Sequence, residues 1–126
     1  MRRIIICIAL LCGIILTGFY SSYKITYINE NVTMHIDAIT VSLNEEDHAA
    51  VIRNIDALRS FWDAEETTLM HFVKHGEIDN VSFCIAKLPS LAAYGNFSDL
   101  SSELASIRRQ VEHIKNSELP ILDNIL

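Results

Sequence analysis

The chain opens with a long apolar run, and hydrophobic residues then recur every three or four positions. Residues 4–20 are seventeen residues without a charge, and Arg2 and Arg3 precede them. At about 1.5 Å per residue such a helix spans about 25 Å, the short end of a membrane-crossing helix. Basic residues on one side keep that side in the cytoplasm. The pattern predicts a transmembrane anchor over residues 4–22, with the bilayer as its partner.

A cleaved signal peptide and a buried soluble helix are the alternatives for this segment. A signal peptide ends at a site of small residues. The candidate sites here place Leu16, Phe19 or Tyr20 where a small residue is needed. Aromatic residues with a polar tip suit the headgroup zone, and three follow the run, namely Tyr20, Tyr23 and Tyr27. We therefore expect the segment to remain attached.

Beyond the anchor the apolar positions form four stripes at helical spacing. The stripes comprise Ile25, Ile28, Val32, Ile36, Ile39 and Leu43; Ala49, Ile52, Ile55, Leu58, Trp62, Leu69, Phe72 and Val73; Ile78, Val81, Ile85, Leu88 and Ala92; and Leu100, Leu104, Ile107, Val111 and Ile114. From these stripes we expect a core that includes Trp62, Ile78, Ile85, Leu104 and Ile107.

Polar residues, Gly and Pro mark the expected ends of these helices. Residues 44–47 (Asn-Glu-Glu-Asp) separate the first two stripes, and Gly76 is expected to end the second helix. Pro89 is expected to kink or stop the third helix because it removes a backbone hydrogen bond. Residues 95–96 (Gly-Asn) then turn the chain, and Ser98 is expected to cap the fourth helix.

These elements predict an all-α protein in which the N-terminal transmembrane helix continues into a small antiparallel bundle of three to four helices. Residues 1–3 would be cytoplasmic, and residues 23–126 would form an extracytoplasmic domain at the outer face of the cell membrane. Only Cys84 lies outside the apolar run, so no internal disulfide can stabilise this domain.

Charge limits the partners of the domain. Without Arg2 and Arg3, eight Lys and Arg residues face sixteen Asp and Glu residues, which leaves a formal charge of −8. A surface of this sign repels anionic lipid and nucleic acid, which argues against nucleic-acid binding. The short acidic run of Asp63, Glu65 and Glu66 is expected to be a solvated face.

Polar residues gather toward the predicted membrane-proximal end of the bundle. They are His71, His75, Glu77, Asp79 and His113. Imidazole and carboxylate groups suit a divalent metal ion or a small ligand. The alternative is a structural polar layer, in which Asp79 lies within about 6 Å of His113 and shifts its pKa. No HExxH motif, Cys pair or nucleophile elbow accompanies them, so we predict no enzymatic activity and no cofactor.

The chain resembles domain-of-unknown-function family 4363. The matching motifs are His75-Gly76-Glu77-Ile78-Asp79-Asn80, Ile85-Ala86-Lys87-Leu88, Glu103-Leu104-Ala105, His113-Ile114 and Asn124-Ile125-Leu126. Trp62 stands where the family has a Trp, while Gly76 and Pro89 depart from the pattern. The resemblance implies a small bacterial protein with one membrane segment, a helical body and no established activity.

Two classes of function follow. The favoured one is a single-pass membrane-anchored helical protein that acts through protein-protein contacts at the outer face of the membrane, with a possible membrane-protein partner. The apolar tail, residues 121–126, supports it because the tail would lie near the bilayer. The alternative is an extracytoplasmic sensor or binder of a divalent metal ion or small ligand at the His and carboxylate cluster.

Overall fold

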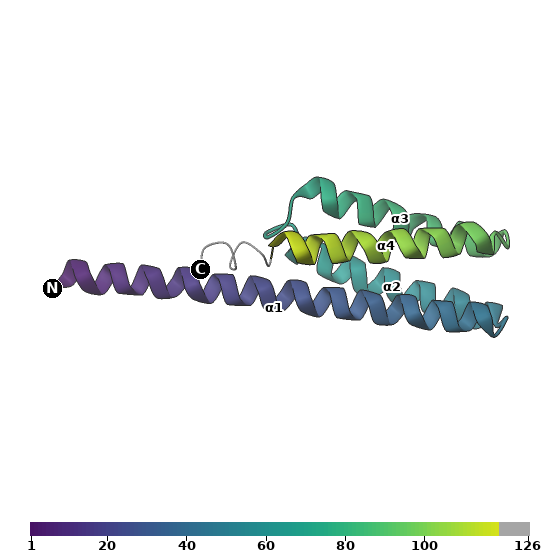
Figure 1. The fold of residues 1–126 in the computed structure, drawn as a ribbon, viewed down its shortest axis with the longest axis horizontal. Helices are drawn as coiled ribbons and strands as arrows, with labels where there is room; N and C mark the ends of the chain where they lie inside the picture. Colours follow the sequence, from purple (N-terminus) through teal and green to yellow (C-terminus); the bar gives the residue numbers. More distant parts are fainter. Residues whose placement is uncertain (119–126) are drawn as a thin grey trace.

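A computed structural model describes residues 1–118 of the chain, and these residues form four helices without strands (Figure 1). The helices are α1 (Arg2–Asn44), α2 (His48–Leu69), α3 (His75–Ala93) and α4 (Phe97–Glu118). The all-α prediction is confirmed. The predicted apolar tail lies outside the described residues.

The four helices form an antiparallel bundle in which α1 and α3 each contact both α2 and α4. Figure 1 shows α2, α3 and α4 alongside the C-terminal half of α1 only, while the N-terminal half of α1 extends beyond them. The α1–α2 and α3–α4 turns lie at the far end, which we call the distal end. The α2–α3 connection, residues 70–74, lies at the opposite end, together with the C-terminus of α4.

Helix α1 runs without a break for 43 residues, but its two halves have different surroundings. Large apolar side chains from Ile4 to Phe19 are mostly exposed, with 64% and 68% for these two residues. From residue 25 onward the face toward the bundle is buried, and its members are Ile25, Ile28, Val32, Ile36 and Ile39. In the described part of the chain, α1 is the one helix long and apolar enough to cross a membrane.

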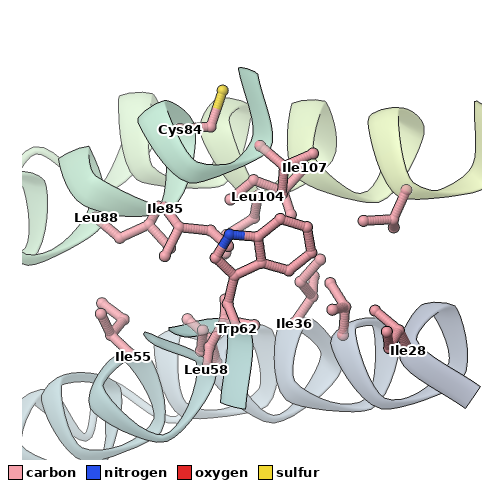
Figure 2. Packing of buried hydrophobic residues seen from close by; sticks show 14 of the residues in the cluster. Ile28, Ile36, Ile55, Leu58, Trp62, Cys84, Ile85, Leu88, Leu104 and Ile107 are labelled. Atoms are coloured by element: carbon pink, nitrogen blue, oxygen red, sulfur yellow. The ribbon is translucent and has the colours of Figure 1, made fainter. Parts of the chain in front are cut away.

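The core lies between the four helices and is built around Trp62 (Figure 2). Trp62 reaches from α2 toward Leu104 and Ile107 of α4, and it is 1% exposed. The other expected core residues, Ile78 and Ile85 of α3, are buried as well. The domain has a single cysteine and no internal disulfide, so its stability depends on this packing. Burying each large apolar side chain contributes about 1.5–3 kcal/mol to the free energy of folding.

The start of α2 differs from the predicted stripe. Ala49 and Ile52 are exposed, and Ala50 and Val51 are buried instead. Asp47 caps the helix by accepting a hydrogen bond from the backbone N–H of Ala50 at 3.1 Å. Residues four apart share a face of a helix, so the buried face that includes Ile55 also includes Val51, while Ile52 points to the surface.

Two helix ends also differ from the prediction. Helix α2 ends at Leu69, and Gly76 lies in the first turn of α3 without a positive φ. Buried Leu69 and Val73 hold a turn in which the N–H of Val73 donates to the carbonyl of Leu69, so the helical spacing there reflects a packed turn. Helix α4 begins at Phe97, and the side chain of Asn96 accepts from the N–H of Asp99 at 3.4 Å, so the cap is Asn96 rather than Ser98.

Pro89 does not stop α3, which continues to Ala93. Proline in a helix removes one hydrogen bond, to the carbonyl four residues before it. That carbonyl belongs to Ile85. Ile85 and Leu88 are buried before Pro89, and Leu91 and Ala92 pack on the core after it. Packing therefore outweighs the missing hydrogen bond.

Truncating the central aromatic tests this core. Trp62→Ala should lower the free energy of unfolding by about 3–5 kcal/mol, the usual effect of removing a buried large aromatic. The measurement is chemical denaturation of the full chain in mild detergent, followed by far-UV circular dichroism. Ile52→Ala is the matched control, because Ile52 is on the same helix and 51% exposed. Equal losses in the two variants would contradict a core built around Trp62.

Candidate functional site

The five polar residues predicted as a cluster lie on the elements that meet at the α2–α3 connection, but the structure joins only two of them. Glu77 Oε1 lies 3.5 Å from His113 Nε2. His71, His75 and Asp79 are exposed. Within residues 1–118 no three His, Cys, Asp or Glu side chains are arranged to hold a metal ion. The register of α3 against α4 therefore gives His113 the carboxylate of Glu77 rather than that of Asp79.

The Glu77–His113 pair is a surface feature. The His113 side chain is 70% exposed and the Glu77 side chain 27% exposed. Exposed ion pairs contribute about 0–1 kcal/mol because water screens them and both side chains lose freedom. Glu77 also lies in the first turn of α3, where backbone N–H groups favour a negative charge. The pair is explained by local electrostatics.

A second junction at this end joins α1 to α2 and its connection. The rings of Tyr20 and Phe72 meet edge to face with centroids 5.9 Å apart. One turn further along α1, Lys24 Nζ lies 2.9 Å from Glu65 Oε2. The hydrogen bond to Glu65 raises the pKa of Lys24. These contacts fix the α2–α3 connection against α1 at the point where the exposed apolar half of the helix ends.

Two of the three residues in the acidic run on α2 serve internal contacts, which corrects their prediction as a solvated face. Glu65 pairs with Lys24, as described above. Glu66 Oε1 accepts a hydrogen bond at 3.1 Å from the hydroxyl of Ser82, which itself accepts one at 2.7 Å from the indole N–H of Trp62. Only Asp63 is exposed. The acidic composition concealed this role because a hydrogen-bond partner on another helix leaves no local sequence signal.

Two groups with shifted pKa values, His35 and Cys84, lie between the helices of the bundle. Burial lowers the pKa of His35, whose ring lies 5.5 Å from that of Phe61. Burial raises the pKa of the Cys84 thiol, which faces the side-chain amide of Gln110 at 3.6 Å. Both shifts follow from packing between helices, because burial is the largest cause of each.

Grooves occur on the outer surface of the bundle, and no pattern in the sequence predicted them. At the distal end a groove of about 320 Å³ is lined by Ser42, Glu46 and His48, among others, beside Phe97. The ring of His48 stacks on that of Phe97 with centroids 5.1 Å apart. A second groove of about 540 Å³ runs between α3 and α4, past Phe83 and Lys87. Mixed apolar and polar linings of this kind suit contacts with another protein.

Comparison with known proteins identifies the family. The family model described as "Domain of unknown function (DUF4363)" matches residues 19–125, which covers most of the chain. The chain therefore belongs to this family, as its motifs predicted. No curated protein and no solved structure matches it.

The hydrogen-bond chain from Trp62 to Glu66 gives a test of the polar part of the interior. Ser82→Ala should lower the free energy of unfolding by about 1–3 kcal/mol, because it leaves the buried indole N–H without its acceptor. Ser90→Ala is the matched control, since Ser90 is exposed on the same helix. Denaturation followed by tryptophan fluorescence measures both variants. A Ser82→Ala protein as stable as the control would show that the hydroxyl does not hold the indole.

Proposed function

We propose that this protein is a single-pass membrane protein whose helical bundle stands outside the cytoplasm and acts through contacts with another protein. The observation that carries the proposal is the exposure of the apolar half of α1. None of its most apolar 18-residue window is buried against the rest of the protein. The core helix of a soluble protein would be largely buried, so this exposure favours a lipid environment.

The energetics support the same conclusion. Ten large apolar side chains between residues 4 and 19 are each about half exposed or more: Ile4, Ile5, Ile6, Ile8, Leu10, Leu11, Ile14, Ile15, Leu16 and Phe19. Moving each from water into an apolar phase gains about 1.5–3 kcal/mol. A helix also satisfies its own backbone hydrogen bonds, as a lipid environment requires.

Charge supports the orientation. Arg2 and Arg3 precede the apolar segment, and positively charged flanks stay in the cytoplasm. The domain that follows carries the acidic surplus of the chain. We place the localisation at the cell membrane, with the N-terminus inside and the bundle outside.

The protein contact is proposed at the distal end of the bundle. Tyr94 is 89% exposed and Ile52 51% exposed. Ile52 lines a groove of about 440 Å³ with Ala93 and Gly95, next to the His48–Phe97 stack. Exposed aromatic and aliphatic side chains beside a groove are common where another protein binds. The alternative of a metal or ligand sensor has less support, because only Glu77 and His113 of its five residues are paired in the described structure.

Cysteine labelling tests the topology. In a chain whose native cysteines are replaced by Ala, Tyr94→Cys should react with a membrane-impermeant maleimide in intact cells. A cysteine inserted after Met1 should react only after the membrane is opened. Intact mass of the membrane fraction should include residues 1–20. Labelling of both positions in intact cells, or a mature N-terminus near residue 20, would contradict the anchor.

The same variant tests the contact. With an impermeant crosslinker attached at position 94, a discrete adduct with another membrane component is expected. Asp63→Cys is the matched control, because Asp63 is exposed on α2 about three helical turns from Ile52. Adducts of the same kind and yield at both positions would indicate random collision rather than a docking surface.

A further inference from the structure

We propose that the α2–α3 connection, residues 70–74, rests on the headgroup layer of the membrane and forms a second lipid contact beside the anchor. This inference depends on the proposed membrane span. It goes further by assigning the bundle itself a lipid-facing end and a fixed orientation.

The length of the span places the connection at the bilayer surface. A hydrocarbon core of about 30 Å requires about 20 helical residues at a rise of about 1.5 Å each. Counted from Ile4, the first apolar residue, the hydrocarbon core then extends to Tyr23. The ring of Phe72 contacts that of Tyr20, so the connection lies level with the last turn of the span. A tilted helix needs more residues to cross, which brings the connection deeper rather than farther away.

An ion pair sets the opposite limit on depth. Lys24 and Glu65 are joined at 2.9 Å, one turn beyond Tyr20. Charged groups are costly within hydrocarbon and stay at or beyond the interface. Because α1 is continuous from Arg2 to Asn44, the two limits apply to one rigid rod. Together they restrict the depth of the connection to a range of about one helical turn, at the level of the headgroup layer.

The side chains of the connection match that environment. Met70 and Phe72 are half-buried and pack on the edge of the core, while His71 and Lys74 are exposed. Apolar side chains beside exposed polar ones suit the interface between lipid headgroups and water. The carboxylates of α2 and α3 nearby are mostly engaged: Glu65 pairs with Lys24, Glu66 accepts from Ser82, and Glu77 pairs with His113. Asp79 of α3 and Glu112 of α4 are exposed.

The contact would hold the bundle upright. Two points of α1, its span and its junction with Phe72, would be tied to the membrane, so the bundle axis follows the axis of the anchor (Figure 1). From Tyr20 to Asn44 the helix rises about 36 Å. The distal grooves would therefore face a partner at that height above the bilayer.

A fluorescent probe tests the contact in the complete chain. The chain carries His71→Cys with its native cysteines replaced by Ala, is labelled with an environment-sensitive fluorophore, and is reconstituted in nanodiscs of phosphatidylcholine and phosphatidylglycerol. Lipids with a nitroxide on the headgroup should quench this probe several-fold more than the same probe at Asn44→Cys. Asn44 is the control because it is exposed at the distal end. Equal quenching at the two positions would overturn the proposal.

A third probe separates this proposal from the anchor. Native Cys12, kept as the single cysteine, lies in the apolar half of α1 and should be quenched by a nitroxide deep in the acyl chains. If Cys12 is quenched and position 71 behaves like position 44, the anchor stands and only the headgroup contact is wrong. If Cys12 is not quenched, the span is wrong and this inference fails with it.

Discussion

The continuity of α1 is the constraint on which the rest of the structure depends. One helix of 43 residues provides an exposed apolar segment at its start and a quarter of the bundle core at its end. No linker lies between these parts, so the position of the bundle is set by the position of the anchor. The contacts of Tyr20 with Phe72 and of Lys24 with Glu65 reinforce this junction where the surroundings of the helix change.

The bundle is stabilised by packing together with a few polar contacts between helices. Trp62 combines both, since its ring fills the core and its N–H donates to Ser82. At the distal end the amide of half-buried Asn54 donates at 2.7 Å to the hydroxyl of Ser42, which is buried. Such bonds favour one register of the helices, because a shifted register would leave buried polar atoms unpaired.

The sequence predicted most of the fold because helical periodicity is a local signal. The stripes of α1 and α4, from Ile25 to Ile39 and from Leu100 to Ile114, are buried as expected. The predicted stripe was wrong at the start of α2, and the predicted helix ends were wrong at Gly76 and Ser98. Pro89 does not stop α3 either, because the effect of a residue on a helix end depends on tertiary packing. For the candidate site, the sequence predicted that His113 of α4 lies near Asp79 of α3. The carboxylate that reaches the imidazole belongs to Glu77, two residues earlier on α3, and a difference this small depends on how the two helices pack. The partners of Glu65 and Glu66 come from other helices, so no pattern within α2 could reveal them.

A distance measurement along α1 tests the central claim most directly. Spin labels at native Cys12 and at Met34→Cys, with Cys7 and Cys84 replaced by Ala, report on both sides of the junction; Met34 is 60% exposed. A continuous helix separates these positions by about 33 Å along its axis. Pulsed electron paramagnetic resonance on the full chain in nanodiscs should give one narrow distribution near that value. A broad distribution that extends to shorter distances would mean a hinge near residues 18–22, and would contradict an anchor and a bundle built on one rigid helix.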